Sequence, residues 1–271
     1  MGAIPAREVR ATAAAPAAAI TVDNLTKRYP VGATSLTALD GVSFDVRDRE
    51  LVAIVGPSGC GKSTLLKILT GLTAPSAGET RVGGRVTTGP RRDIGAVFQA
   101  PLLFPWRTVI ENVMLPADVQ RLDRAASLRR ARDLIDLVGL GEFVDRYPNE
   151  LSGGMQQRVA IARALVHDPA ILLMDEPFGA LDAMTRERMN LELKRLWRES
   201  HKSILFITHS IPEAVFLASR VVVMTPRPGR VADVVEIDLP SDRGLEAMNA
   251  PEFGAYVGRI RAHFGAVGGL D

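Results

Sequence analysis

The chain has 271 residues, of which 46% are hydrophobic and 24% charged, a globular composition that excludes a disordered or fibrous protein. Its 33 Lys and Arg residues nearly balance its 31 Asp and Glu residues, so no nucleic-acid partner is expected. The single cysteine, Cys60, excludes an internal disulfide. No apolar run approaches the roughly 20 residues that a membrane-spanning helix needs.

Residues 1–19 are rich in alanine and proline and superficially resemble a signal peptide. Arg7 and Arg10 precede the Ala-rich part, but alanine is only weakly apolar and Pro16 interrupts the run. A secretory signal needs a more apolar core of about 7 to 15 residues. We therefore expect residues 1–19 to be a disordered leader rather than a targeting segment.

From Ile20 to about residue 240, short β-branched runs alternate with longer helical patterns. This alternation predicts an α/β fold. The runs LVAIV, ILLM, ILFIT and VVVM lack polar alternation, as expected of strands that helices cover on both faces. The expected strands are residues 20–29, 42–46, 51–55, 94–98, 171–174, 204–208, 221–224 and 231–237.

Strand signals are absent between residues 98 and 171, where Arg-rich helical patterns include residues 121–138. We therefore expect a helical subdomain at about residues 100–165. Residues 241–271 follow the last expected strand as a helical tail with spaced glycines and no recognisable chemistry.

The segment after the strand at residues 51–55 has the pattern of a phosphate-binding loop. GPSGCGKST, residues 56–64, matches G-x-x-x-x-G-K-[ST] between a strand and a helix. Its glycines let backbone N–H groups converge on phosphate oxygens at the positive end of the helix. Lys62 is expected to reach the β and γ phosphates, and Ser63 to bind Mg²⁺. We interpret Cys60 as a small spacer, the alternative being a thiol whose pKa the helix end lowers.

Two adjacent acids, Asp175 and Glu176, follow the apolar run ILLM. Beside a phosphate-binding loop, Asp175 is suited to hold Mg²⁺ and Glu176 to polarise the attacking water. His209 ends the next apolar run, so it is expected where ligands of open α/β folds bind. Ser210 and Glu213 directly after it predict a capping box.

A second anion-binding pattern, LSGGMQQR, precedes the acidic pair. Ser152 can cap the helix expected at residues 156–167, while Gly153 and Gly154 let an anion approach its positive end. One chain does not obviously bring both helix ends around one γ phosphate, whereas two antiparallel copies can. Nucleotide binding and dimerisation would then be the same event.

These motifs, in this order, resemble the ATP-binding subunits of ABC transporters over residues 20 to about 237. GPSGCGKST resembles the Walker A loop, LSGGM the signature, ILLMDE the Walker B strand and GALD the D-loop. Gln99 in VFQ stands where the family has its Q-loop glutamine, and His209 where it has its H-loop histidine. The sequence departs from the family at Met155, where Gln is frequent, and at Ser210, where many members carry Asp.

The resemblance implies a P-loop NTPase fold with a mostly parallel core sheet, an antiparallel β subdomain and a helical subdomain. It implies an ATPase that uses ATP and Mg²⁺, with catalytic residues Glu176, His209, Gln99 and Lys62. The implied nucleotide-binding residues are Tyr29, which would stack on adenine, and Gly56, Pro57, Ser58, Gly59, Cys60, Gly61, Lys62, Ser63 and Thr64. The implied metal ligands are Ser63, Gln99 and Asp175. The residues implied to act on the partner copy are Leu151, Ser152, Gly153, Gly154 and Met155 of the signature and Asp182 of the D-loop.

By the same resemblance, the chain pairs with itself or a paralogue across two ATP sites. It would bind polytopic permease subunits at the cytoplasmic face of the membrane, with an extracytoplasmic solute-binding protein as an indirect partner. Leu102, Leu103, Phe104 and Trp106 stand where the family receives a coupling helix of the membrane subunit. We therefore expect part of this cluster to be exposed as a socket.

The runs LFPW and LLMDEPFGALDAMTR are most similar to importer ATPases of the nitrate, sulfonate, taurine and pyrimidine-precursor group. A small solute of that kind is the expected cargo. The alternative is a soluble ABC ATPase that does not drive transport, for example in cluster assembly. Repair ATPases of that class carry long heptad insertions and translation ATPases carry two cassettes, and this sequence has neither.

Overall fold

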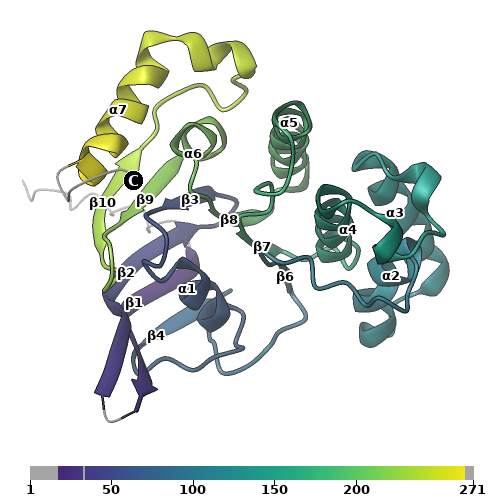
Figure 1. Ribbon diagram of the computed structural model, residues 1–271, viewed down its shortest axis with the longest axis horizontal. Helices are drawn as coiled ribbons and strands as arrows, with labels where there is room; N and C mark the ends of the chain where they lie inside the picture. Colours follow the sequence, from purple (N-terminus) through teal and green to yellow (C-terminus); the bar gives the residue numbers. More distant parts are fainter. Residues whose placement is uncertain (1–17, 33, 266–271) are drawn as a thin grey trace, which may run out of the picture.

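Two β-sheets organise the computed structural model, which describes residues 18–32 and 34–265 (Figure 1). The strands are β1 (Ala18–Val31), β2 (Thr34–Arg47), β3 (Leu51–Val55), β4 (Ala77–Val82), β5 (Arg85–Val86), β6 (Ile94–Val97), β7 (Ile171–Asp175), β8 (Ser203–Ile207), β9 (Arg220–Met224) and β10 (Val231–Glu236). One sheet is antiparallel, with the order β2-β1-β4-β5. The core sheet has the order β10-β9-β3-β8-β7-β6, in which β10 pairs antiparallel with β9 and every other pair is parallel. The predicted α/β fold with a mostly parallel core sheet is confirmed.

Helices lie on both faces of the core sheet and, as a separate group, beyond its β6 edge (Figure 1). They are α1 (Lys62–Leu69), α2 (Val109–Gln120), α3 (Arg124–Leu137), α4 (Gly153–Leu165), α5 (Ala183–Ser200), α6 (Ile211–Leu217) and α7 (Pro251–Gly265), with 3₁₀ turns at Gly141–Phe143, Pro148–Glu150 and Leu245–Asn249. The separate group is α2, α3 and α4, of which α4 lies nearest the sheet. No helix within the described ranges is long and apolar enough to cross a membrane.

The central strand β3 has no polar alternation in its sequence because both of its faces are buried. All five of its residues are buried. Leu51, Ala53 and Val55 contact the apolar cluster that includes α6 and the separate helices, whereas Val52 and Ile54 contact the cluster beneath α1 and β1. Alternate residues of a strand point to opposite faces, so a strand between two helical layers is apolar at every position.

The antiparallel strands β4 and β5 were not predicted from the sequence. The β4 segment AGETRV mixes exposed polar and buried apolar residues, so its apolar signal is short. Gly83 and Gly84 have φ of +56° and +72°, the backbone of a tight hairpin turn. The dipeptide Gly-Gly between β-branched residues is the sequence signal that was overlooked.

Two expected helices have different bounds in the structure. The helix expected at residues 121–138 begins only at Arg124, because Arg121 has φ +58° and ends α2, and Asp123 caps α3 by accepting from Ala126 N at 2.7 Å. The helix expected at residues 156–167 is α4, which starts at Gly153 and ends at Leu165.

The expected leader, residues 1–19, overlaps the first strand, because β1 already begins at Ala18. The remainder of that leader, residues 1–17, lies outside the described residues. In the expected tail, α7 buries Phe253 and Ile260 against the core, while residues 266–271 again lie outside the described part.

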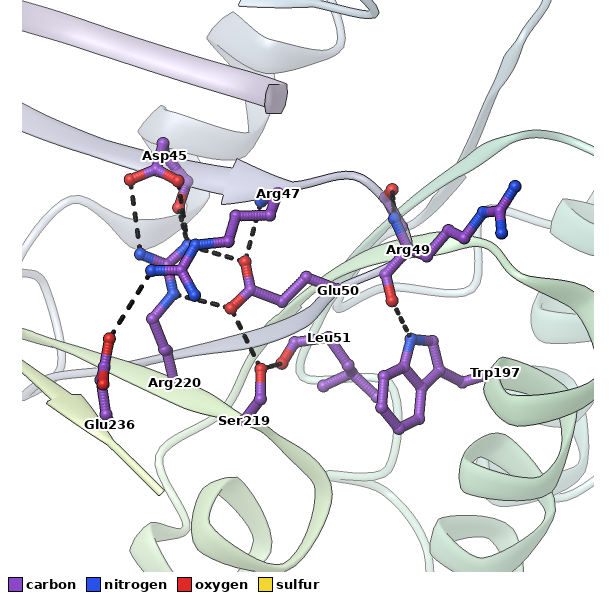
Figure 2. A network of polar contacts seen from close by, with 10 residues as sticks. Asp45, Arg47, Arg49, Glu50, Leu51, Trp197, Ser219, Arg220 and Glu236 are labelled. Atoms are coloured by element: carbon purple, nitrogen blue, oxygen red, sulfur yellow. Dashed lines mark hydrogen bonds and ion pairs between the residues drawn. The ribbon is translucent and has the colours of Figure 1, made fainter. Parts of the chain in front are cut away.

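A buried ion-pair network ties β2 and β3 to β9 (Figure 2). Arg220 at the start of β9 is 7% exposed, and Glu50 just before β3 is 8% exposed. The Arg220 guanidinium donates to Glu50 Oε2 at 2.6 Å and to Asp45 Oδ2 at 3.0 Å. Burial raises the pKa of Glu50, but the hydrogen bond and charge of Arg220, together with a hydrogen bond from the Arg47 N–H, outweigh it and hold the pKa below its usual value. The network therefore joins the antiparallel sheet to the core sheet through charges that depend on one another.

Lys194 of α5 is buried, and no acidic side chain within residues 18–32 and 34–265 forms an ion pair with it. It is 4% exposed, and its Nζ donates to the carbonyl oxygens of Arg243 at 2.7 Å and Phe216 at 3.4 Å. The ammonium group also lies 4.5 Å from the centre of the Phe216 ring. Burial, assisted by the charges of Arg243 and Arg198, lowers the pKa of Lys194 to about 7.

Because of this low pKa, burial of Lys194 destabilises the folded protein by an amount that depends on pH. Between the folded value of about 7 and the unfolded value of 10.5, the unfolded chain binds more protons, so stability rises with pH across this window. Lys194→Met removes that titration. The melting temperature of the variant minus that of the parent should therefore be higher near pH 7 than near pH 9, by about 3 °C or more.

Differential scanning calorimetry of both proteins across this pH range measures the difference. Lys67→Met serves as the matched control, because it removes an exposed lysine from α1. A Lys194→Met difference that does not change between pH 7 and pH 9 would show that the amine is charged in the folded protein.

Candidate nucleotide site

The phosphate-binding loop lies between β3 and α1, in the strand-loop-helix context expected from the sequence. Gly61 ends the loop with φ +102°, in the left-handed region that favours glycine. A Cβ atom there would lie 2.6 Å from Leu39 Cδ2 and 2.8 Å from the Ala38 carbonyl oxygen. Glycine is therefore required at position 61 both by the backbone conformation and by the close approach of β2.

The Lys62 side chain folds back over the loop and is 7% exposed. Its Nζ donates to the carbonyl oxygens of Gly56 at 2.7 Å and Pro57 at 3.1 Å. Charge-assisted bonds from an ammonium group to phosphate oxygens are stronger than bonds to these neutral carbonyls. The side chain is thus placed to exchange the loop carbonyls for the oxygens of a bound phosphate.

Cys60 is a buried spacer within the loop rather than a reactive thiol. The residue is fully buried, and its Sγ lies 3.7 Å from Lys62 Nζ. Burial raises the pKa of the Cys60 thiol despite the opposing charge of Lys62. The alternative of a helix end that lowers this pKa is therefore wrong, because loss of solvent outweighs the nearby positive charge.

The two acids after β7 occupy different environments. Asp175 is 4% exposed, and burial raises its pKa, an effect that the hydrogen bond from Ser63 opposes. The carboxylate of Asp175 and the hydroxyl of Ser63 therefore lie together beside the phosphate-binding loop. Hard oxygen donors of this kind suit Mg²⁺, which typically takes one or two carboxylates together with substrate phosphates.

Glu176 is the point where three sequence-predicted residues meet. Its Oε2 accepts from Gln99 Nε2 at 3.3 Å, and His209 Nδ1 lies 3.3 Å from the same oxygen. The Glu176 backbone has φ +47°, and its N–H donates to Ile207 O of β8 at 2.9 Å. The parallel strands β6, β7 and β8 end side by side, and this brings the three side chains together although they are far apart in sequence.

The residues on either side of His209 fix the turn that carries it. Ser210 caps α6 by accepting from Glu213 N at 3.4 Å, as half of the predicted capping box requires. The other half was wrong, because the Glu213 carboxylate accepts from the Thr208 hydroxyl instead of the Ser210 N–H. Ser210 N donates to Thr208 Oγ1 at 3.0 Å, so both neighbours of His209 are held while its own side chain stays largely exposed.

A cavity of about 340 Å³ opens between the loop, β1, β2 and the ends of the core strands. The expected residues that line it are Tyr29, Ser58, Gly59, Gly61, Lys62, Ser63, Thr64, Gln99 and Glu176. Leu36, Ala38 and Arg227 line it as well and were not predicted. The strand pairing that places Tyr29 beside Leu36, and the turn after β9 that carries Arg227, are long-range features without a local sequence signal.

A different cavity, also of about 340 Å³, shares no lining residue with the first and is lined by Ser152, Gly153, Gly154 and Met155 of the signature and by Asp182. The remaining signature residue, Leu151, is buried. Ser152 caps α4 by accepting from Met155 N at 3.3 Å, and Asp182 caps α5 by accepting from Thr185 N at 3.0 Å. Gly154 packs closely on the D-loop, since a Cβ atom there would lie 3.1 Å from Leu181 Cδ2. The two predicted phosphate sites thus stand apart within one chain.

Comparison with known sequences decides the family. The protein-family model described as "ABC transporter" matches residues 39–179, about half of the chain. The chain belongs to the ABC transporter family. It is an ATP-binding subunit and an ATPase of that family, and we call it the cassette from here on.

Relatives of the cassette cover most of its length. An uncharacterized ABC transporter ATP-binding protein of Methanocaldococcus jannaschii is 48% identical over 82% of this chain and 84% of its own. Taurine import ATP-binding proteins of Rhizobium johnstonii and Burkholderia thailandensis are 52% and 50% identical, over 74% and 73% of this chain and 77% and 76% of their own.

Solved structures with the same fold include a dimeric bacterial ABC transporter cassette. It superposes with a TM-score of 0.76 at 37% identity, over 82% of this chain and 100% of its own. A dimeric post-hydrolysis state of that ATP-binding cassette, bound to ADP and Pi, gives a TM-score of 0.75 at 36% identity over the same shares.

The segment after Gln99 exposes an apolar surface on the cassette. Leu102 is 60% exposed, Trp106 70% and Phe104 36%, and the two aromatic rings lie 5.2 Å apart. Leu103 instead packs against the core, so three of the four residues are exposed, as expected for part of this cluster. Asn112 is fully buried and clamps the Phe104 backbone, accepting from its N–H at 2.8 Å and donating to its carbonyl at 3.1 Å.

Helix α4 holds the backbone on both sides of Gln99. Gln157 Nε2 donates to Phe98 O at 3.1 Å. Arg163 donates to Pro101 O at 2.6 Å and to Leu102 O at 2.7 Å. The same helix starts at the signature, so one rigid element connects the signature, Gln99 and the exposed apolar surface.

Proposed function

We propose that this cassette is the ATP-hydrolysing subunit of an importer for a small solute and works as a dimer bound to permease subunits. The observation that carries the proposal is the meeting of Lys62, Ser63, Gln99 and Glu176 around one cavity, with Asp175 and His209 directly adjacent. This arrangement contains a phosphate-binding cation, oxygen ligands for a metal and a carboxylate for water. ATP hydrolysis needs all three together.

In the proposed mechanism, each residue acts from the place that the fold gives it. Lys62 exchanges the Gly56 and Pro57 carbonyls for β and γ phosphate oxygens and neutralises their charge. Glu176 accepts a hydrogen bond from the attacking water and takes its proton, while Gln99 and His209 orient the Glu176 carboxylate. Ser63, Asp175 and Gln99 would hold Mg²⁺, which supplies charge neutralisation at the phosphates.

The signature supports a sandwich of two copies. Ser152, Gly153 and Gly154 begin α4 and face a cavity away from the chain's own phosphate-binding loop. A helix N-terminus with small residues binds phosphate when the phosphate is brought to it. An antiparallel second copy, or a paralogue, would bring its nucleotide there and complete both sites. The dimeric solved cassette, similar over its whole length, supports this arrangement.

A sulfonate such as taurine is the cargo that the relatives support best. Two taurine import ATP-binding proteins are at least 50% identical to the cassette over about three quarters of its length. Solute choice would lie with the permease subunits and an extracytoplasmic solute-binding protein. The cassette itself would bind the permease peripherally at the cytoplasmic face of the membrane, through Leu102, Phe104 and Trp106.

Co-purification tests this function. Tagged Glu176→Gln protein with Mg-ATP should recover a polytopic membrane protein in stoichiometric amount from host membranes solubilised in mild detergent. Trp106→Ser added to this protein should reduce that recovery several-fold, because it removes the most exposed aromatic of the surface. Its effect on ATP hydrolysis in the otherwise unchanged soluble cassette should be small.

Val119→Ser is the matched control, since Val119 is 69% exposed on α2 but lies outside the proposed contact surface. Recovery should be unchanged by it. A soluble ATP-locked dimer with no membrane protein, when the host's cognate genes are expressed, would contradict the transport function and favour a non-transport ABC ATPase.

A further inference from the structure

A second cationic side chain reaches the nucleotide cavity from a segment far along the chain. Arg227 lies in the turn between β9 and β10, yet it lines the same cavity as Lys62 and Tyr29. Its Nε donates to the Gly59 carbonyl oxygen at 3.2 Å, within the phosphate-binding loop. None of the motifs that identify the family contains this residue, so its position calls for a separate explanation.

The turn that carries Arg227 is fixed against the loop. Gly229 N donates to Ala38 O and Asp40 N donates to Gly229 O, both at 3.0 Å. A Cβ atom at Gly229 would lie only 1.9 Å from the Cys60 carbonyl oxygen, so the two backbones are in direct contact. The turn is therefore held by β2 and by the loop itself. Arg227 approaches the cavity from a rigid support rather than from a free loop.

The guanidinium of Arg227 retains donors for a ligand. Only its Nε is used, and its two terminal nitrogens donate to no acceptor within residues 18–32 and 34–265. Nη2 lies 3.1 Å from where a Cβ atom of Gly59 would stand, so the terminal group extends over the glycine of the loop. A planar guanidinium with two free N–H edges suits bidentate contact with phosphate oxygens.

The charge of the cavity points to the same ligand. Lys62 and Arg227 are the cations among its lining residues and Glu176 is the acid. The Lys62 ammonium is buried and engages two loop carbonyls, whereas Arg227 is exposed on the cavity side of Gly59. Backbone N–H groups of such a loop cradle phosphates, so a cation over Gly59 faces the phosphate end of a nucleotide and not its base.

We propose that Arg227 binds the nucleotide by donating from its terminal nitrogens to β or γ phosphate oxygens of ATP or ADP. The inference rests on the proposed binding of a nucleotide in this cavity. The affinity of the parent protein for ATP, ADP and AMP tests that binding separately. Arg227 would add affinity from outside the phosphate-binding loop. It would also select nucleoside di- and triphosphates over monophosphates, because only these carry a phosphate that reaches Gly59.

The test compares the parent with Arg227→Gln and Arg230→Gln, measured by competition of ATP, ADP and AMP against a fluorescent ADP analogue. Arg227→Gln should weaken ATP and ADP about tenfold and leave AMP within twofold, as loss of a charge-assisted bond to a phosphate would. Arg227→Lys should recover part of the loss, since it keeps the charge without the planar fork. Arg230 belongs to the same turn but pairs with Asp40 outside the cavity, so Arg230→Gln should leave all three affinities unchanged.

Equal melting temperatures of the two variants would exclude a general effect on the turn. Unchanged ATP and ADP affinities in Arg227→Gln would overturn the proposal, and so would an equal loss for AMP, which would place the contact at the base, ribose or α phosphate. A parent protein that binds none of the nucleotides would contradict the proposed function itself, an outcome distinct from either of these.

Discussion

Glu176→Gln is expected to lower the rate of ATP hydrolysis by at least about 100-fold, the usual contribution of a general base. The amide keeps the size of the side chain and can still face Gln99 and His209, but it cannot take a proton from water. Binding of Mg-ATP should persist, because Lys62 and the loop are unaltered. Steady-state phosphate release and size-exclusion chromatography with Mg-ATP measure both effects, and the variant should accumulate as an ATP-bound dimer.

The control for this substitution is Glu187→Gln. Glu187 is exposed on α5, outside both cavities, and its replacement should leave turnover within twofold of the parent. Normal turnover of Glu176→Gln would sink the assignment of Glu176 as the base. Loss of both turnover and Mg-ATP binding would instead show that the carboxylate is needed to hold the site together.

Arg220→Met should strongly destabilise the fold although it lies outside the nucleotide cavity. It leaves Glu50, which is 8% exposed, as a buried carboxylate without its counter-charge. Breaking a buried ion pair by removing one partner costs about 3–5 kcal/mol. We expect the midpoint of urea unfolding to fall correspondingly. Arg47→Met provides the comparison, since Arg47 makes an exposed ion pair with Glu236 and should cost at most about 1 kcal/mol.

The pH dependence of the same network has a definite sign. The folded pKa of Glu50 is below its usual value, so its contribution is present above the unfolded pKa and is lost as pH falls through the folded one. The stability difference between the parent and Arg220→Met should therefore shrink in acid. Equal unfolding midpoints for Arg220→Met and Arg47→Met at neutral pH would show that the buried pair contributes no more than a surface pair.

The sequence predicted the local parts of the site better than their surroundings. The phosphate-binding loop depends on glycines and a lysine at fixed spacing between β3 and α1, so a single chain suffices to identify it. The meeting of Gln99, Glu176 and His209 follows from parallel strands whose ends share one edge, and the motifs anticipated it. Arg227 was not predicted because the turn between β9 and β10 reaches the loop only through tertiary contacts.

The fold shows the same division between local and long-range determinants. Continuous apolar runs such as those of β3, β8 and β9 were recognised because burial on both faces removes polar alternation. The hairpin of β4 and β5 was missed because β4 is partly exposed, so burial leaves only a weak pattern. The Glu213 carboxylate was assigned to the wrong partner because nothing in the capping pattern reveals that Thr208 lies nearer.

In the proposed dimer, helix α4 connects the exposed apolar surface of one cassette to the nucleotide of the other. It has 13 residues, a rod of about 20 Å at 1.5 Å per residue, and it grips the chain beside Gln99 through Gln157 and Arg163. A membrane subunit that tilts the exposed aromatic surface would tilt this rod as one body. In the proposed dimer, Ser152 at its start would face the other copy's nucleotide, so each permease subunit would act chiefly on the ATP held by the cassette it does not touch.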